Sequence, residues 1–118
     1  LKKLRLQAFF HCCNGLVVIF VRMISTQLEQ TYYEKAIAAV ADPIRIRILQ
    51  EILQKGFVRC GDVVEFTGLS QPTCSHHIKL LLDSELIISN KEGRYNNFTI
   101  NKENFERLSE FMQYFSRS

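Results

Sequence analysis

The chain has 118 residues, of which 47% are hydrophobic and 23% are charged, proportions typical of one globular domain. The sequence lacks any apolar run of about 18 residues or more, which disfavours an integral membrane protein, and a cytoplasmic protein is expected. The sequence contains no P-loop, no GxGxxG and no GxSxG motif. The common nucleotide-binding and hydrolase signatures are therefore excluded, and no cofactor is expected.

The net charge of +3 is unevenly distributed along the chain. Residues 1–22 contain four of the 15 Lys and Arg residues and no acidic residue, so this segment carries +4. Residues 23–118 therefore hold 11 basic and 12 acidic residues, a net charge of −1. Nucleic-acid binding by this larger part would have to depend on the local placement of a few cations.

Residues 1–22 are treated as an N-terminal extension of uncertain status, and residues 23–118 as the predicted domain. The extension has a basic start and an apolar middle, in outline a secretory signal, but polar residues interrupt the apolar part. Three interpretations stay open: translation begins at Met23, the segment forms an additional helix, or it is a weak export signal. Cys12 and Cys13 lie in this segment and are given little functional weight.

Two helices separated by Asp42-Pro43 are predicted in the first half of the domain. Apolar residues recur at helical spacing across Thr26–Val40, which predicts the first helix. Asp is a good N-cap and Pro is favoured at the first helical position, so a second helix is predicted from Pro43 up to Gly56. A short extended link over Phe57–Cys60 follows.

The next segment has the outline of a helix-turn-helix. A short helix is predicted over Gly61–Thr67, where Gly68 ends it, and Ser70 is predicted to cap a helix that runs to about Leu82. Apolar residues at i, i+4, i+7 and i+8 of this second helix are expected to be buried: Cys74, Ile78, Leu81 and Leu82. Polar residues on its opposite side are expected to face outward: Gln71, Thr73, Ser75, His76 and Lys79.

A hairpin and a last helix complete the predicted domain. Leu86–Asn90 and Tyr95–Ile100 favour strands, and they flank a turn over Lys91–Arg94 in which Gly93 supplies a positive φ. Asn101 is predicted to cap a helix that ends at about residue 115. The order of elements predicts a mainly α (α+β) fold, a winged helix-turn-helix with flanking N- and C-terminal helices.

The two flanking helices carry many large apolar side chains for so small a domain. They include Tyr32, Ile37, Phe105, Phe111 and Phe115. Some of these should exceed what the core of a monomer can cover, and a two-fold dimer would bury them. We therefore expect a homodimer that forms through the first and last helices.

Three segments match a known sequence pattern. Ala41–Leu49 reads ADPIRIRIL, similar to ADPTRLRIL; Leu69–Lys79 reads LSQPTCSHHIK, similar to LSQPTVSHHLK; and Lys91–Tyr95 with Phe98 is similar to REGRxxYY. Over roughly residues 35–115 the chain thus resembles the ArsR/SmtB family of bacterial metal-responsive repressors. The resemblance implies a DNA-binding transcriptional regulator, a homodimeric repressor of a double-stranded DNA operator that an inducer releases.

In a helix-turn-helix the second helix reads the major groove, and the wing follows the DNA backbone. Gln can bond adenine bidentately, and Ser or His can reach phosphates or base edges, which favours Gln71, Ser75 and His76 as contacts. The alternative is an ordinary solvated helix face. The full set of expected DNA-binding residues is Ser70, Gln71, Thr73, Ser75, His76, Lys79, Lys91 and Arg94.

The residues present do not match the inducer sites that the resemblance would imply. One type uses Cys-x-Cys followed by Asp, where this chain has Arg59-Cys60-Gly61-Asp62, and soft metals need two or three thiolates. Another type uses Asp and His on the last helix, and residues 101–118 contain neither. No metal site is therefore expected. His77 could in principle join one with Cys74, but a partly buried, hydrogen-bonded His77 is favoured.

Cys60 and Cys74 form a possible redox pair, because a disulfide near the DNA-reading helix would distort it. A core role is favoured, because Cys74 lies in an apolar stripe, where Cys often serves as a small hydrophobic residue. A thiol-based redox-sensing regulator without metal is thus one alternative function. A winged-helix protein-interaction module is another, since residues 23–118 are nearly neutral. An enzyme is not expected, because no catalytic arrangement of Cys, His and Asp is recognisable.

Overall fold

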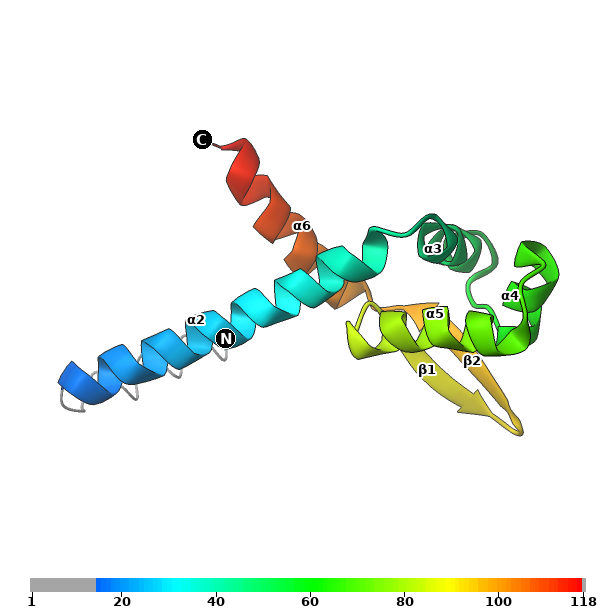
Figure 1. Cartoon of the computed structure of the whole chain (residues 1–118), viewed down its shortest axis with the longest axis horizontal. Coiled ribbons are helices and arrows are strands. Elements are labelled where there is room, and N and C mark those ends of the chain that lie inside the picture. Colours follow the sequence, from blue (N-terminus) through cyan, green and yellow to red (C-terminus); the bar gives the residue numbers. More distant parts are fainter. Residues whose placement is uncertain (1–14, 118) are drawn as a thin grey trace. The chain divides into compact units, whose positions relative to one another are not determined.

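A computed structural model of the protein describes residues 15–117, which form five helices and one two-stranded hairpin (Figure 1). The chain divides after Tyr32 into two compact units, and the second contains everything from the last turns of the first helix onward. In chain order the elements are α2 (Gly15–Val40), α3 (Pro43–Lys55), α4 (Cys60–Thr67), α5 (Gln71–Asp83), β1 (Ile87–Glu92), β2 (Tyr95–Ile100) and α6 (Lys102–Ser116).

The helix α2 begins earlier than the sequence predicts. A start at Thr26 is wrong, because the helix is continuous from Gly15 to Val40. Residues 16–40 contain neither Pro nor Gly, so nothing in the local sequence interrupts the helical backbone. None of the helices in the described part of the chain combines the length and apolar character needed to cross a membrane. Cys12 and Cys13 lie outside the described residues.

The predicted limits of α3 are confirmed. The Asp42 carboxylate accepts hydrogen bonds from the backbone N–H groups of Ile44 and Arg45, at 2.9 and 3.2 Å, so it caps the helix that Pro43 opens. At the other end Gly56 adopts a φ of 88°, and its N–H donates to the Ile52 carbonyl at 2.7 Å.

The helix-turn-helix formed by α4 and α5 is confirmed as well. Helix α4 begins at Cys60, one residue earlier than predicted, and ends where Gly68 adopts the left-handed conformation. The Ser70 hydroxyl accepts the N–H of Thr73 at 3.4 Å and so caps α5. The predicted apolar stripe of α5 faces the core: Cys74 and Leu81 are fully buried, Ile78 is nearly so and Leu82 is half-buried.

The hairpin differs from the prediction at its turn. Strands β1 and β2 are antiparallel and stay paired as far as Glu92 opposite Tyr95, so the turn consists of Gly93 and Arg94 alone. The predicted four-residue turn is wrong, because a φ of 63° at Gly93 lets the chain reverse within two residues. Lys91 and Glu92 therefore belong to β1.

The link between α3 and α4 takes part in the sheet. Val58 forms an isolated antiparallel bridge with Phe98, in which each backbone N–H donates to the other's carbonyl at 3.1 and 2.8 Å. The link was expected to be extended, but its pairing with β2 could not be read from the local sequence. It joins the helix-turn-helix to the hairpin through the backbone.

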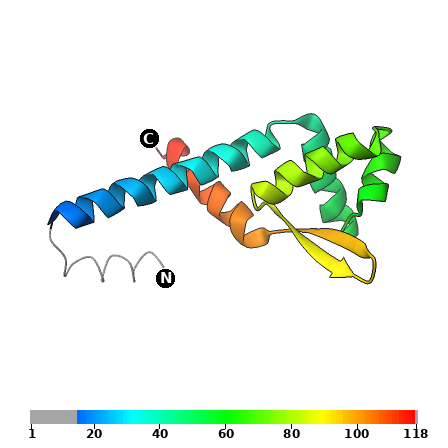
Figure 2. The same cartoon turned by 60° about the horizontal axis from the view of Figure 1, so that its bottom comes forward.

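One apolar core holds these elements together. Strand β1 packs on α5 and β2 on α3, an arrangement that Figures 1 and 2 show from two sides. The fully buried side chains of this core are Ile48, Ile52, Val58, Val63, Cys74, Leu81 and Leu86. Helix α6 adds the buried Leu108, and its Phe111 stacks on Tyr33 at a ring distance of 4.0 Å. The predicted winged helix-turn-helix is confirmed.

Candidate nucleic-acid interface

The outer face of α5 carries the polar side chains that the helical pattern placed there. All of them are exposed: Ser70, Gln71, Thr73, Ser75, His76 and Lys79. Thr73, His76 and Lys79 lie across the helix from the buried Cys74, Ile78 and Leu81, so helical periodicity explains their exposure. Ser75 flanks the buried stripe, and Ser70 and Gln71 stand at the N-terminal end of α5, as its N-cap and its first residue. This face therefore meets the first requirement for reading a duplex, which is access.

Three of the hydroxyl groups on this face have neighbours within the protein. The hydroxyls of Ser70 and Thr73 lie 2.7 Å apart, so both belong to the cap of α5. The hydroxyl of Ser75 lies 3.4 Å from the Cys60 sulfur at the start of α4. These contacts fix the first turn of α5 and its approach to α4, while Gln71 projects from that turn as an exposed side chain.

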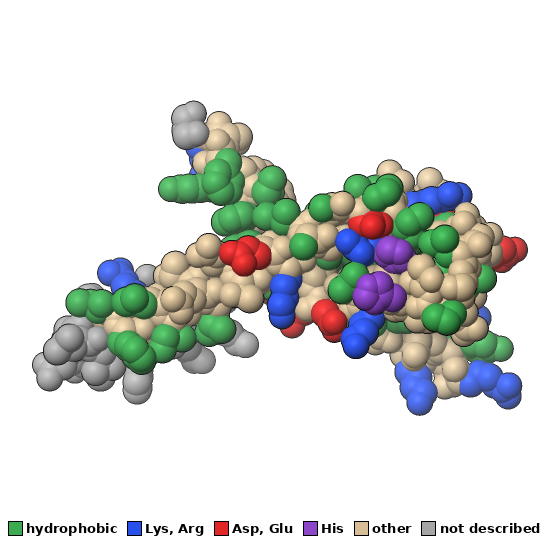
Figure 3. Space-filling model, viewed as in Figure 1, with side chains coloured by type: hydrophobic (Ala, Val, Ile, Leu, Met, Phe, Trp, Pro, Cys, Tyr) green, Lys and Arg blue, Asp and Glu red, His purple; other side chains and the backbone are tan. Residues whose placement is uncertain are grey.

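The two predicted wing cations lie at the end of the hairpin. Lys91 and Arg94 are both exposed, with Arg94 in the turn and Lys91 near the end of β1. Figure 3 shows basic side chains at the free end of the hairpin and histidine side chains over α5, on the same face of the molecule. The role of these cations in DNA binding stays a prediction.

Arg59 and Asn97 were not among the predicted site residues, yet they connect the wing to the helix-turn-helix. The Arg59 Nε donates to the Asn97 side-chain oxygen at 2.8 Å, and the Asn97 Nδ2 donates to a Glu92 oxygen at 2.7 Å. The Arg59 guanidinium also lies over the Tyr95 ring, 4.6 Å from its centre. Arg59 and Asn97 are 38 positions apart in the sequence, so only the fold brings them together.

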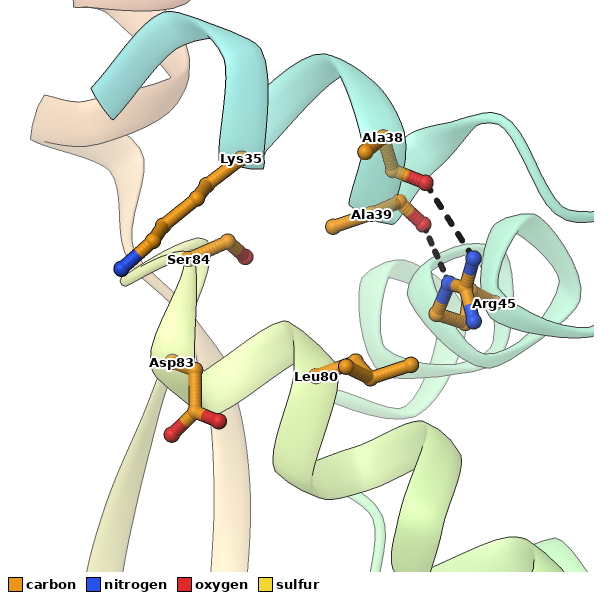
Figure 4. A pocket seen from close by; sticks show the side chains of 7 residues that line it. All are labelled: Lys35, Ala38, Ala39, Arg45, Leu80, Asp83 and Ser84. Atoms are coloured by element: carbon orange, nitrogen blue, oxygen red, sulfur yellow. Dashed lines mark hydrogen bonds between the residues drawn. The ribbon is translucent and has the colours of Figure 1, made fainter. Parts of the chain in front are cut away.

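A second network joins three helices through Arg45 on α3. Its Nε donates to the Ala39 carbonyl at 2.5 Å and its Nη2 to the Ala38 carbonyl at 3.2 Å, both at the end of α2 (Figure 4). Its Nη1 lies 3.3 Å from the Nδ1 of His77 on α5. The expectation of a partly buried, hydrogen-bonded His77 is confirmed, since its side chain is 14% exposed.

Asp42 completes this second network. Its carboxylate lies 4.0 Å from both Arg45 and His77. Desolvation raises the pKa of Asp42, but hydrogen bonds from the backbone N–H groups of Arg45 and Ile44, with the charges of Arg45 and His77, hold the pKa below its usual value. Asp42 is therefore an ionised cap that faces α5.

A cavity of about 420 Å³ opens beside this network, between the end of α2 and the end of α5 (Figure 4). Its wall is largely apolar, and three charged side chains line it, Lys35 and Asp83 on one side and Arg45 on the other (Figure 4). The lining residues are Lys35, Ala38, Ala39, Arg45, Leu80, Asp83 and Ser84.

Cys60 and Cys74 are both free thiols in the structure. Cys74 is fully buried, with its sulfur 3.5 Å from the Thr67 hydroxyl, whereas Cys60 is half-buried. Across residues 15–117, no group of three or more His, Cys, Asp or Glu side chains is placed to hold a metal ion. The redox pairing of the two thiols stays a prediction.

Comparison with known proteins gives these features a context. Residues 40–89 match a family model described as a helix-turn-helix domain. The chain is 33% identical over 76 residues to the arsenical resistance operon repressor of Bacillus subtilis (strain 168), which covers 64% of this chain and 72% of that protein. The chain belongs to the ArsR family. This membership makes it a winged helix-turn-helix transcriptional regulator, as the sequence patterns implied.

Other known proteins agree with this chain in sequence or in fold. The transcriptional repressor SdpR of Bacillus subtilis (strain 168) is 33% identical over 63 residues, which cover 53% of this chain and 69% of SdpR. The crystal structure of an ArsR family transcriptional regulator superposes with a TM-score of 0.67 and 25% identity, covering 75% of this chain and 90% of that one.

A homodimeric winged helix-turn-helix DNA-binding domain from Mycobacterium bovis, solved by NMR, gives a TM-score of 0.60 at 24% identity. It covers 79% of this chain and 83% of its own. At this identity the likeness concerns the fold.

Proposed function

We propose that this ArsR family regulator is a homodimeric repressor that binds a double-stranded DNA operator and releases it when an inducer binds. The observation that carries the proposal is the exposed polar face of α5, which is backed by a buried stripe and lies on the same side as the basic end of the hairpin. The naming of two relatives as repressors supports the direction of regulation. A repressor of this kind acts where bacterial DNA lies, in the cytoplasm.

In this proposal α5 enters the major groove of each half-site. Gln71, at the start of the helix, pairs bidentately with an adenine, and Ser75 and His76 reach base edges or phosphates. Ser70, Thr73 and Lys79 contact the backbone at the rim of the groove. The wing cations Lys91 and Arg94 bind phosphates beside it. These contacts supply the positive charge that the domain as a whole lacks.

The second copy in the dimer covers exposed apolar side chains of α2 and α6. On α6, Met112 is 52% exposed and Phe115 is 60% exposed, and on α2 Ile37 is 39% exposed. A two-fold dimer would bury these groups and set two α5 helices about 34 Å apart, one turn of DNA. The homodimeric state of the Mycobacterium bovis domain supports a second copy of this chain as the molecule that covers these side chains.

Selection of duplexes from a randomised DNA library with the purified full chain tests the proposal. We expect a sequence with two-fold symmetry, whose half-site centres lie about 10 base pairs apart. Affinity for the selected duplex should exceed that for a scrambled duplex of equal composition by at least about 10³-fold at physiological salt. Light scattering should give the mass of a dimer.

Two outcomes would contradict the proposal. Equal affinity for the selected and scrambled duplexes would show that α5 does not read the DNA sequence. Absence of any binding at low salt, where non-specific attraction is strongest, would instead favour the protein-interaction module.

A further inference from the structure

We propose that Arg59 is a positioning residue that fixes the wing against the helix-turn-helix and thereby places Lys91 and Arg94 on the DNA backbone. The inference rests on the proposed function. It gives Arg59 a role that its position in the sequence, next to Cys60, did not indicate. Arg59 does not need to touch DNA in this role. It acts through the hairpin that its side chain holds.

The backbone of Arg59 is part of the helix-turn-helix. Its N–H donates to the Asp62 carboxylate at 2.9 Å, a capping contact that ties Arg59 to the first turn of α4. The preceding residue, Val58, is bridged to Phe98 and fully buried. The backbone is therefore held at the N–H of Arg59 and at the preceding residue, and the side chain extends from a fixed point.

The far end of the Arg59 side chain contacts the wing. Its Nε donates a hydrogen bond to Asn97, and its guanidinium lies over two aromatic rings, 4.6 Å from the centre of Tyr95 and 5.6 Å from that of Phe57. In the antiparallel bridge that pairs Val58 with Phe98, the adjacent positions Arg59 and Asn97 lie opposite each other. One side chain thus contacts β2 at two residues of the same face.

Asn97 extends this network of contacts from β2 to β1. It is only 9% exposed, and its amide bonds Arg59 on one side and Glu92 on β1 on the other. Buried polar groups whose partners are all satisfied give a defined geometry, because any displacement leaves a desolvated group without a partner. Glu92 is also the one acidic residue in Lys91–Arg94, and this bond holds its carboxylate on the Asn97 side.

The wing needs such an external anchor. A two-stranded hairpin is marginally stable by itself, and its angle to neighbouring elements is not set by its own register. Arg suits the task because its planar guanidinium can donate through Nε and stack on a ring at the same time, which the Lys ammonium cannot do. The substitution Arg59→Lys therefore removes the hydrogen bond from Nε and the stacking on the ring, and it keeps the positive charge.

The salt dependence of binding to the selected operator duplex tests the inference, measured on the full chain by fluorescence anisotropy. For Arg59→Lys we expect about tenfold weaker binding and a salt slope reduced by about one to two phosphate contacts, because Lys91 and Arg94 leave the backbone. Arg47→Lys is the matched control, since the Arg47 guanidinium lies over Phe66 at 5.3 Å and belongs to α3. Its slope should stay unchanged.

A mutant cycle separates positioning from direct contact. Adding Arg94→Ala to Arg59→Lys should cost little further affinity, whereas adding Gln71→Ala should multiply the two losses, because the proposed contact of Gln71 with a base does not act through Lys91 or Arg94. Hydroxyl-radical protection of the flanking backbone should be lost while protection under α5 persists. If Arg59→Lys does not fold, Tyr95→Leu removes the stacking ring at a 52% exposed position and should give the same pattern at about threefold.

Three results would overturn the inference, and they differ in what they mean for the proposed function. An unchanged salt slope in Arg59→Lys, or losses that multiply with Arg94→Ala, would show that Arg59 does not place the wing, although the operator reading by α5 would stand. If Arg94→Ala alone leaves the slope of the wild-type chain unchanged, the wing does not bind phosphate, and the wing part of the proposed function fails together with this inference.

Discussion

Helix α5 and the hairpin are held in different ways, although both are proposed to touch DNA. Helix α5 is placed by a stripe of buried apolar side chains, including Cys74 and Leu81, and its outer face follows from helical periodicity. The hairpin shares this core only at its base, through Ile87 and Phe98, while its end is exposed and polar contacts join Arg59 to Asn97 and Asn97 to Glu92. Non-directional burial thus places the helix that is proposed to read the DNA sequence, and directional bonds are added to burial in the hairpin that is proposed to follow the DNA backbone.

The difference predicts that the two elements fail separately. Loss of an apolar contact under α5 should unfold the domain, because the same side chains form its core. Loss of a polar contact at the wing should change binding and leave the core intact. The substitutions below test this division, beginning with the largest expected effect.

Leu81→Ala should destabilise the domain by about 2–5 kcal/mol, since it removes a fully buried side chain from the rear of α5 and leaves a cavity. Urea unfolding followed by circular dichroism gives the free energy of unfolding. Leu53→Ala, at a position that is 70% exposed, is the control and should stay within about 0.5 kcal/mol of the wild type. Similar losses for both variants would contradict burial as the force that places α5.

Gln71→Ala should lower discrimination at one base pair by about 1–3 kcal/mol without changing the free energy of unfolding, because Gln71 is exposed and its proposed partner is a base. Affinity for the selected duplex and its single-base variants measures this effect. Gln54→Ala, an exposed glutamine on α3, should leave discrimination unchanged. If Gln71→Ala also leaves it unchanged, the outer face of α5 has been assigned wrongly.

Asp42→Ala should cost about 1 kcal/mol of stability at neutral pH, because it removes the cap of α3 and the anion that faces His77 on α5. The folded-state pKa of Asp42 is lowered, so this carboxylate stabilises the fold above its unfolded-state pKa of about 3.9, and the contribution is lost as the pH falls through the folded-state value.

Asp42→Asn is the matched control, since it keeps a capping side chain that does not ionise. Urea unfolding at neutral pH and at about pH 3 should show the gap between wild type and Asp42→Asn shrink on acidification. A gap that is constant or grows would mean that the charge of Asp42 contributes nothing to the fold.

Arg94→Ala should have the smallest effect on affinity, nearly equal on all sequences, and should reduce the salt slope by about 0.9. Arg94 lies in the exposed turn, so the free energy of unfolding should hardly change. Lys55→Ala removes a cation of α3 that pairs with Glu51 and serves as the control, with an unchanged slope expected. A sequence-dependent loss in Arg94→Ala would mean that the wing reads bases.

Most of the helix-turn-helix could be predicted from the sequence because its signals are local. The Asp42 and Ser70 caps, the glycines at 56 and 68 and the apolar stripe of α5 each act within a few residues. The two larger errors in the predicted bounds have local causes as well. Helix α2 continues toward the N-terminus since nothing interrupts it, and the hairpin turn is shorter because Gly93 needs only one partner residue to reverse the chain.

The sequence by itself determined which elements form, which face of α5 is polar and which cations stand near the hairpin turn, because helical and strand periodicity act over a few residues. Only the tertiary structure decided that Val58 pairs with Phe98, that Arg59 meets Asn97 and that Arg45 joins the end of α2 to His77. These contacts connect residues far apart in the chain, and hydrogen bonds of that kind exist only after the apolar core has brought their donors and acceptors together.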